Sequence, residues 1–364
     1  MRVLYDNEIF LIQKYGGATR YFYELIKRMP ALKAEVILYM GKFINEYGLE
    51  KYADSFNIFS GTKVRHIPRT KLISIKIQKP LFERFAVRQD FNLIHQTYFG
   101  DINISKDFKR VITVHDFTHE RLSSNFSSLD RTAELKKLAV KKADGIICVS
   151  ESTKNDLLER YDTKGKKIKV IYHGNSLKYD VTEERIIKDK YLLYVGDRRS
   201  YKNFGILIKV FEMNEALRSE YKVVCCGGGK FTKGETEKMA EANVLNNFTQ
   251  TEARDRTIAN LYFYAKAFVY PSKYEGFGIP MIEAMYNGCP IIASNVSSLP
   301  EVGGESALYF NPDSPEELKE QINVILNNKE KVERMTSSGK ERERMFSWNT
   351  CAEETYKFYE EVTG

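Results

Sequence analysis

The chain has 364 residues, of which 43% are hydrophobic and 29% are charged, and this composition excludes a disordered, collagen-like or coiled-coil protein. Its length is typical of two domains, and no apolar run approaches the roughly 18 residues of a membrane-spanning helix. The first residues mix charged with apolar side chains, so the sequence predicts no secretion signal and a cytoplasmic location.

Short apolar runs typical of buried strands alternate with amphipathic segments along the first half of the chain. The predicted strands are residues 2–5, 35–39, 93–95, 111–114, 145–149 and 169–172. Helix patterns occupy residues 18–29 and 153–160, and Ser150 is a typical N-cap for the second of these. Such alternation predicts an α/β fold whose parallel sheets are covered by helices on both faces.

A second series follows the polar stretch 175–190, which we predict to be the interdomain linker. Its predicted strands are 191–195, 221–226, 267–270 and 290–293, and its predicted helices are 203–215, 254–263, 280–287 and 315–327. We therefore expect two Rossmann-like, doubly wound domains, residues 1–178 and 188–346, that face each other across a cleft.

The two halves of the chain differ in charge. Residues 1–185 hold 33 basic and 23 acidic side chains, whereas the remainder holds 23 basic and 26 acidic. This asymmetry favours an anionic partner for the first half, whether phosphate, a membrane surface or nucleic acid. The five cysteines form no Cys-x-x-Cys pair and only five histidines are present, so we expect reduced thiols and no metal site.

Gly16 and Gly17 precede a predicted helix soon after the first strand. A glycine pair at this position presents backbone amides at the positive end of the helix dipole, which suits an anion. The same pair also occurs in ordinary tight turns, so anion binding and a plain turn both stay open.

Three cations follow the predicted strand 191–195, namely Arg198, Arg199 and Lys202. Doubly wound sheets bind ligands at the carboxyl ends of their strands, and such cations stabilise the charge on a departing diphosphate. The alternative is a solvated basic loop. Because the cations directly follow a buried strand, we favour diphosphate binding.

The most specific pattern is the run from Tyr270 to Ala284, in which a strand is followed by a glycine-rich loop and a helix. Gly276 and Gly278 let the backbone approach a ligand closely. Glu275 in the loop and Glu283 in the helix can each accept hydrogen bonds from a pair of hydroxyl groups. For Glu283 alone, interaction with the helix dipole is the alternative.

Together these patterns resemble a retaining glycosyltransferase of family 4, which has the GT-B fold, over nearly the whole chain. The motifs are Glu275-x7-Glu283, Val195-Gly196-x-Arg198-x-x-Tyr201-Lys202-Asn203, Gly16-Gly17-x-x-Arg20-Tyr21, His115-Asp116, Val149 to Thr153, and Asn295-x-Ser297-Ser298-Leu299-Pro300-Glu301-Val302. Asp197 and Tyr201 stand where some members place the arginine, so Arg198 is our choice and Arg199 the alternative.

The resemblance implies a role for each motif. Glu275 and His115 contact the transferred sugar, Glu283 contacts the ribose, and Arg198 with Lys202 binds the diphosphate and acts in catalysis. The other donor-binding residues that it implies are Gly16, Gly17, Gly276, Phe277 and Gly278. It also implies that residues 347–364 form a helix that packs back on the first domain, so we expect deletion of residues 348–364 to abolish turnover and spare nucleotide binding.

The implied reaction is transfer of a hexose, here mannose from GDP-mannose, to a growing, lipid-linked surface polysaccharide, with no cofactor or metal ion. Because both glutamates have binding roles, attack on the face that the phosphate leaves is the expected route to retention. The alternatives are a sugar-nucleotide epimerase or phosphorylase on the same fold and, less favoured, a basic nucleic-acid-binding protein, for which the sequence has no motif.

The acceptor side is expected in the first domain. Residues 63–88 hold eight basic and one acidic side chain, interleaved with apolar residues near helical spacing. This pattern is typical of a helix on an anionic membrane surface, and equally of a helix packed on the sheet with a solvated basic face. His95 and Tyr98, which follow a predicted strand, are the candidates for acceptor contact.

Overall fold

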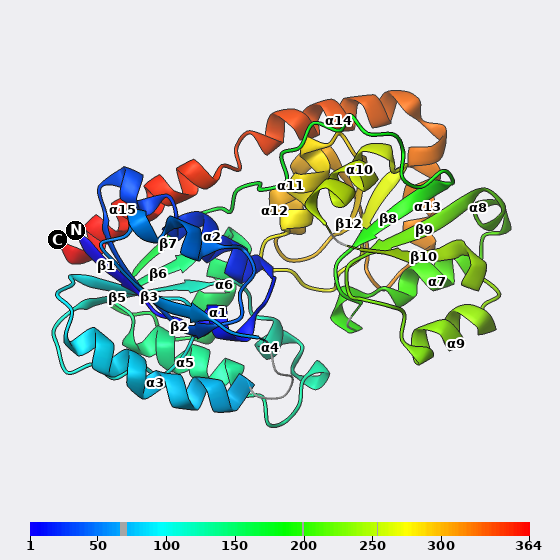
Figure 1. Ribbon diagram of the computed structural model, residues 1–364. Coiled ribbons are helices and arrows are strands. Elements are labelled where there is room, and N and C mark those ends of the chain that lie inside the picture. The colour runs from blue at the N-terminus through cyan, green and yellow to red at the C-terminus, as the bar shows by residue number, and fades with distance from the viewer. Residues whose placement is uncertain (66–70, 199, 253) are drawn as a thin grey trace. The chain divides into compact units, whose positions relative to one another are not determined.

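The computed structural model describes residues 1–65, 71–198, 200–252 and 254–364, and for residues 71–74 it describes the backbone alone. The chain forms two compact units (Figure 1). The first consists of Met1–His173 and Ser347–Gly364, and the second of Gly174–Phe346. The predicted linker 175–190 therefore lies within the second unit.

The first unit is built on a parallel sheet with the strand order β3-β2-β1-β4-β5-β6-β7. Its strands are β1 (Arg2–Tyr5), β2 (Glu35–Phe43), β3 (Ile58–Lys63), β4 (Leu93–Gln96), β5 (Lys109–Val114), β6 (Gly145–Cys148) and β7 (Lys167–Val170). Its helices are α1 (Glu8–Ile12), α2 (Gly17–Ile26), α3 (Lys71–Val87), α4 (Thr118–Arg121), α5 (Thr132–Lys142), α6 (Glu151–Arg160) and α15 (Trp348–Thr363).

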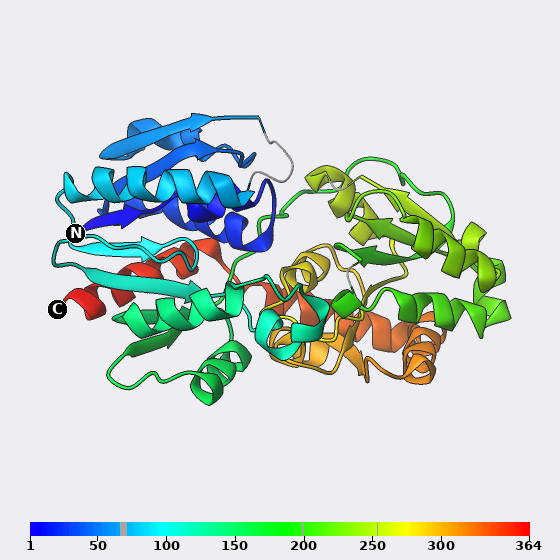
Figure 2. The same ribbon diagram turned by 90° about the horizontal axis from the view of Figure 1, so that it is seen from below.

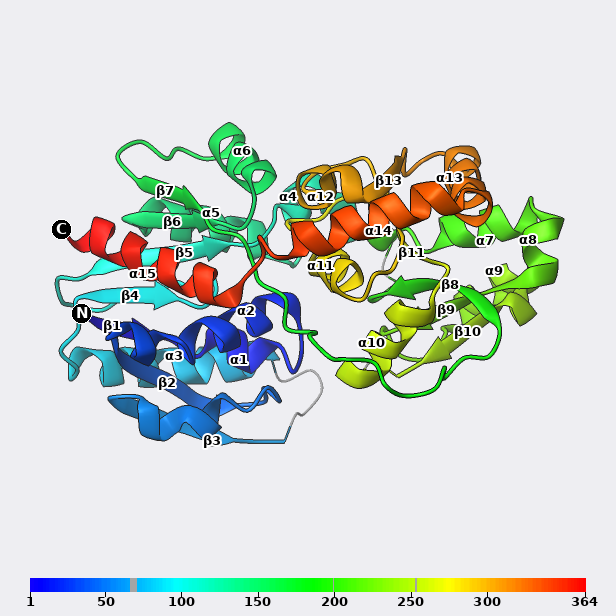
Figure 3. The same cartoon turned by 90° about the horizontal axis from the view of Figure 1, so that it is seen from above.

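Helices cover both faces of this sheet. Alternate strand residues point to opposite faces, so Val3 packs with α2 and α15 on one side, whereas Leu4 packs with α3 on the other. Figures 1 and 2 show α3 and α5 on the face opposite α15, and Figure 3 shows α15 lying along the central strands. Since α15 supplies buried Trp348 and Tyr359 to this core, deletion of residues 348–364 is expected to destabilise the first unit.

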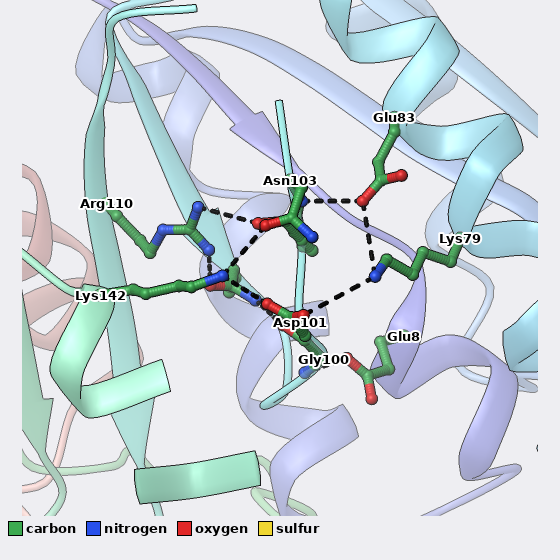
Figure 4. A network of polar contacts seen from close by, with 10 residues as sticks. Glu8, Lys79, Glu83, Gly100, Asp101, Asn103, Arg110 and Lys142 are labelled. Carbon is green, nitrogen blue, oxygen red and sulfur yellow. Dashed lines mark hydrogen bonds and ion pairs between the residues drawn. The ribbon is translucent and has the colours of Figure 1, made fainter. Parts of the chain in front are cut away.

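Charged side chains fix the loop between β4 and β5 to the neighbouring helices (Figure 4). Lys142 of α5 bonds to Asp101, and Lys79 of α3 lies 3.9 Å from the same carboxylate. The backbone amide of Asn103 donates a 2.8 Å hydrogen bond to Glu83 of α3. The inner side of α3 is thus tied to the sheet by polar contacts as well as by buried Phe82.

The second unit is built on a parallel sheet with the order β10-β9-β8-β11-β12-β13. Its strands are β8 (Lys190–Val195), β9 (Tyr221–Cys226), β10 (Phe248–Thr251), β11 (Ala267–Tyr270), β12 (Ile291–Ser294) and β13 (Ala307–Phe310). Its helices are α7 (Gly205–Glu212), α8 (Glu215–Glu220), α9 (Lys233–Glu241), α10 (Asp255–Tyr264), α11 (Ile279–Tyr286), α12 (Leu299–Gly303), α13 (Pro315–Asn327) and α14 (Lys329–Glu343).

The first strand of this unit, β8, pairs with β9 on one side and with β11 on the other, so the strand order reverses beside it. Helices α7 and α13 pack on one face with the apolar side chains of β8 and β9. Figure 1 shows α10 and α11 above the sheet and α7 below it. The unit is therefore doubly wound, as the alternation of strands and helices predicts.

The predicted central strands are confirmed. The predicted N-cap is confirmed as well, because the Ser150 side chain accepts a 3.0 Å hydrogen bond from the Thr153 amide. Strands β3, β10 and β13 were not predicted. All three lie at sheet edges. Strands β3 and β10 are partly exposed and contain polar residues, so they lack the continuous apolar run that marks a central strand, whereas β13 is apolar and mostly buried and was missed all the same. The first predicted helix ends early, at Ile26, and a 3-10 turn containing Pro30 follows.

None of the helices among the described residues combines the length and the apolar character that crossing a membrane requires.

Gly145 on β6 tests how tightly α15 packs against the first sheet. A Cβ atom there would lie 2.6 Å from Val362 Cγ2 and 3.0 Å from Phe358 Cε1, both on α15. We expect Gly145→Ala to lower the free energy of unfolding of the first unit by about 1–3 kcal/mol, the usual cost of overpacking. Urea unfolding followed by the fluorescence of Trp348, the single tryptophan, measures this change in the first unit.

Gly234→Ala is the matched control, because a Cβ atom at Gly234 has no neighbour within 4 Å. An unfolding midpoint for Gly145→Ala equal to that of the control would contradict the predicted packing.

Candidate functional site

The strongest candidate site lies where two loops of the second unit meet. One loop follows β8 and carries Lys202, and the other follows β11 and carries Glu275. Lys202 Nζ lies 2.6 Å from Glu275 Oε1. Because β8 and β11 are the neighbours between which the strand order reverses, this ion pair stands at the place where doubly wound sheets bind ligands.

The pair is largely shielded from water. The side chain of Lys202 is 17% exposed and that of Glu275 is 12% exposed. Burial alone would lower the pKa of Lys202, but Glu275, Tyr201 and Asp197 together more than offset this effect, so the pKa is raised and the ammonium stays charged. The Tyr201 and Tyr270 rings lie 5.2 and 5.9 Å from the Lys202 nitrogen. The site therefore presents a cation and a carboxylate side by side.

Backbone contacts hold the loop after β8 against its neighbours. The Lys273 amide donates a 2.8 Å hydrogen bond to the Tyr201 carbonyl, which links this loop to the loop after β11. Asn203 has a left-handed backbone with a φ of 56°. Its side-chain amide donates a 2.7 Å hydrogen bond to the Pro312 carbonyl in the loop after β13. These contacts place Lys202 beside Glu275 rather than in solvent.

Two serines hold the loop that carries Glu275. The Glu275 amide donates a 3.0 Å hydrogen bond to Ser297 Oγ. The buried Ser298 hydroxyl lies 2.9 Å from the carbonyl of Glu275 and 2.8 Å from that of Phe277. The prediction gave these serines no role, although the motif from Asn295 to Val302 contains both.

Gly278 ends the glycine-rich loop and caps α11. Its φ is 112°, a conformation that residues with a Cβ rarely adopt, and an added Cβ would lie 3.2 Å from Leu299. Glu283 follows on α11, where its side chain is buried and its Oε2 accepts a 3.4 Å hydrogen bond from Tyr262 of α10. Burial, and next the charge of Glu283, raise the pKa of Tyr262. The two predicted glutamates thus belong to the same loop-and-helix segment.

The Arg198 side chain is bound within the second unit. Its side chain is 3% exposed, and its Nε donates a 2.8 Å hydrogen bond to Glu235 of α9. The rest of the guanidinium donates to loop carbonyls after β9, at 2.9 Å to Gly227, 3.0 Å to Gly229 and 3.0 Å to Lys230. These bonds commit the guanidinium to the protein, so direct contact of Arg198 with a diphosphate requires that they break.

The alternative cation, Arg199, lies outside the described residues. Lys202 is therefore the predicted cation that the described structure brings into contact with a predicted sugar-binding carboxylate.

In the first unit, His115 lies directly after β5, at the carboxyl end of that strand. The ring centroids of His115 and Tyr21 are 5.2 Å apart in an edge-to-face arrangement, and those of His115 and His173 are 5.7 Å apart in a stacked one. Burial lowers the pKa of His115 to about 4, so the imidazole is neutral at physiological pH. Its Nε2 is buried and has no hydrogen-bond partner among the described residues, which is unusual for a buried polar atom.

The prediction that His95 contacts the acceptor is wrong. His95 is fully buried, its Nδ1 lies 2.6 Å from the Tyr359 hydroxyl, and its Nε2 lies 2.8 Å from Thr113 Oγ1. Burial also lowers its pKa to about 3. Both nitrogens are used in the core, because β4 extends through His95 and turns the side chain toward α15. Tyr98, the second acceptor candidate, is only partly buried.

The predicted anion site at Gly16 and Gly17 forms the N-terminus of α2. The Gly16 amide donates to the Tyr47 hydroxyl at 3.3 Å, and the Gly16 carbonyl accepts the first helical hydrogen bond from Arg20 at 2.9 Å. Gly17 is exposed at the first position of the helix. The geometry is that of a helix start with an accessible end.

Two family models match the chain one after the other. Residues 15–178 match the model described as Glycosyltransferase Family 4, and residues 179–342 match the model described as Glycosyl transferases group 1. The boundary between the two matches falls close to the boundary between the two structural units.

The chain is similar along nearly its whole length to the O-antigen chain mannosyltransferase B of Escherichia coli. The two are 27% identical over 378 residues, which cover 94% of this chain and 95% of the relative. Among solved structures, sucrose-phosphate synthase from Thermosynechococcus elongatus has a TM-score of 0.79 at 20% identity and covers 99% and 98% of the two chains.

HepE from Anabaena, solved in complex with UDP and glucose, has a TM-score of 0.75 at 15% identity, with 99% of this chain and 100% of that chain covered. At these identities the structural likenesses show the fold alone, and the family models add the class of enzyme. The chain belongs to the glycosyltransferases that these two models describe, and it is a hexosyltransferase with the GT-B fold.

Proposed function

We propose that the chain is a retaining, metal-independent hexosyltransferase that moves mannose from GDP-mannose to a growing, lipid-linked surface polysaccharide. The observation that carries the donor side is the Lys202–Glu275 pair, in which a cation suited to a diphosphate lies 2.6 Å from a carboxylate suited to sugar hydroxyls. The name of the E. coli relative supports mannose and a surface polysaccharide. The UDP and glucose bound to HepE represent the alternative donor chemistry.

Each donor group has a proposed partner. Lys202 binds the diphosphate, Glu275 accepts hydrogen bonds from hydroxyls of the sugar, and Glu283 accepts them from the ribose. The backbone of Gly276, Phe277 and Gly278 approaches the donor. Arg198 supports this arrangement indirectly, since it holds the loop after β9 in place.

The proposed reaction breaks the bond between the anomeric carbon and the phosphate oxygen and forms a bond from that carbon to the acceptor oxygen. Lys202 stabilises the negative charge on the departing diphosphate, and the acceptor proton goes to the departing phosphate oxygen on the same face. Because Glu275 and Glu283 both have proposed binding roles toward the donor, neither is free to act as a nucleophile, which supports same-face attack over a covalent intermediate. The neutral His115 offers its unpartnered Nε2 to a hydroxyl of the transferred sugar.

We also propose that α3 attaches the enzyme peripherally to an anionic membrane, where a lipid-linked acceptor resides. Three apolar side chains on its outer face, Ile77, Leu81 and Val87, are 59%, 52% and 51% exposed. Lys76, Arg84 and Arg88 are exposed beside them. Lys63, by contrast, lies on β3 and pairs with Glu46 at 2.7 Å, and residues 66–70 lie outside the described residues. The proposal therefore rests on the outer stripe of α3.

The donor is tested by a thermal-shift panel of GDP, UDP and their hexose conjugates with the full chain. We expect GDP-mannose to raise the melting temperature most, because it is the proposed donor. A ligand at about 100 times its Kd adds about 2.7 kcal/mol of stability. Turnover with a lipid-linked oligosaccharide is expected to continue in EDTA and to keep the anomeric configuration. A preference for UDP-sugars would overturn the donor assignment, and release of sugar phosphate or an epimer would overturn the reaction.

The different roles of the two cations are tested by Lys202→Gln and Arg198→Met. Lys202→Gln is expected to lower kcat/KM by about 100-fold, since one well-aimed donor to developing charge contributes about 3 kcal/mol. Arg198→Met leaves four carbonyls and Glu235 without their donor, so its main effect is a lower unfolding midpoint. Full stability of Arg198→Met with a loss of turnover equal to that of Lys202→Gln would restore direct diphosphate binding by Arg198.

Membrane attachment is tested by cosedimentation with vesicles of phosphatidylcholine alone or mixed with phosphatidylglycerol. We expect binding to the anionic vesicles, and we expect the double variant Ile77→Ser, Leu81→Ser to weaken it by about tenfold, because two apolar side chains no longer enter the interface. Leu129→Ser is the control, since Leu129 is 87% exposed elsewhere in the first unit. Equal binding of the wild type, the double variant and the control would contradict attachment through α3.

A further inference from the structure

Lys202 is proposed to bind the diphosphate of the donor, and Glu275 is proposed to bind its sugar. In this structure these two side chains bind each other. Lys202 Nζ and Glu275 Oε1 are 2.6 Å apart, and both side chains are largely buried. A lysine that binds two phosphate groups and a glutamate that binds sugar hydroxyls must each find room for new partners. The pair is therefore a constraint on donor binding as well as a part of the site.

We propose that donor binding exchanges the partner of Lys202: the ammonium leaves Glu275 for the diphosphate, and this exchange frees the carboxylate to bind the hydroxyls of the sugar. The inference rests on the proposed donor site and adds a coupling between the two halves of the donor. The diphosphate is recognised first, and the sugar hydroxyls are recognised as a consequence.

Lys202 is the partner that moves in this exchange, because its side chain is the longer and more flexible of the two. Glu275 is held at its own amide by Ser297 and at its own carbonyl by Ser298. Lys202 carries its charge on a flexible four-carbon stem, and the structure describes Glu275 as its ion-pair partner. Rotation of the lysine side chain is enough for the exchange, and the serines keep the backbone of Glu275 in place while it occurs.

The electrostatics favour the exchange when a diphosphate arrives. A diphosphate carries more negative charge than one carboxylate, so it competes well for an ammonium whose surroundings already keep it charged. A neutral free hexose brings no charge that could replace Glu275. The enzyme is thus expected to bind nucleoside diphosphates without a sugar and to bind free mannose poorly.

Isothermal titration of the full chain with GDP and UDP tests the exchange in Glu275→Gln. Glutamine keeps the shape of the side chain but removes the charge that competes for Lys202. We expect the Kd of the preferred nucleoside diphosphate to fall by about tenfold, in line with the loss of one competing charge-assisted hydrogen bond. The extra affinity that the hexose adds to that diphosphate is expected to disappear.

Two further variants make the result specific to this pair. Asp313→Asn removes a carboxylate that pairs with Lys273 at 2.5 Å at the same edge of the sheet, and its nucleotide affinity is expected to equal that of the wild type. Lys202→Gln removes the cation itself, so adding Glu275→Gln to it should no longer tighten nucleotide binding. A gain that persists in this double variant would show simple relief of repulsion and would overturn the exchange.

The outcomes separate this inference from the function on which it rests. If the wild type binds neither GDP nor UDP, the proposed donor site is wrong. If it binds one of them but Glu275→Gln leaves the Kd unchanged or raises it, the donor site stands and the exchange is refuted. A weaker affinity would mean that Glu275 holds Lys202 in place for the diphosphate instead of competing for it.

Discussion

The buried ion pair between Lys202 and Glu275 is the interaction on which the donor-binding account depends. A pair shielded from water is costly to break by removing one member, because an unpaired charge then stays buried. It forms here because parallel strands β8 and β11 are neighbours and their loops leave the sheet at the same edge. The hydrogen bonds from Lys273 to Tyr201 and from Glu275 to Ser297 then fix the two loops. The fold thus places opposite charges together at the crevice of the second sheet.

The position of a charge in the sequence does not reveal which way its side chain turns. Arg198 and Lys202 follow the same strand, but Arg198 turns to the loop after β9 and to Glu235, whereas Lys202 turns to Glu275. A planar guanidinium suits several backbone carbonyls at once, and a single ammonium suits one carboxylate. We therefore propose that Arg198 acts as a positioning residue, whose effect on the donor passes through the loop that it holds.

Sequence reasoning predicted the central strands and the loop from Glu275 to Gly278 because these features have local signatures. A buried parallel strand such as β11 is a continuous apolar run, and the glycine at 278 adopts a φ of 112°. Strands β3 and β10 lack such runs and were not predicted, whereas the apolar edge strand β13 was missed although it has one. His95 was assigned to an acceptor because a histidine near a strand end often meets ligands, but its hydrogen bonds to Thr113 and to Tyr359, which is 264 residues away in sequence, are invisible locally.

The most direct measurement of the central claim is a crystal structure of the full chain with a bound nucleotide sugar. The account predicts diphosphate oxygens within hydrogen-bond distance of Lys202 Nζ and sugar hydroxyls on the carboxylate of Glu275, with Arg198 still bound to the loop after β9. A donor bound away from the edge where β8 and β11 end, or one whose diphosphate contacts Arg198 while Lys202 stays on Glu275, would contradict it.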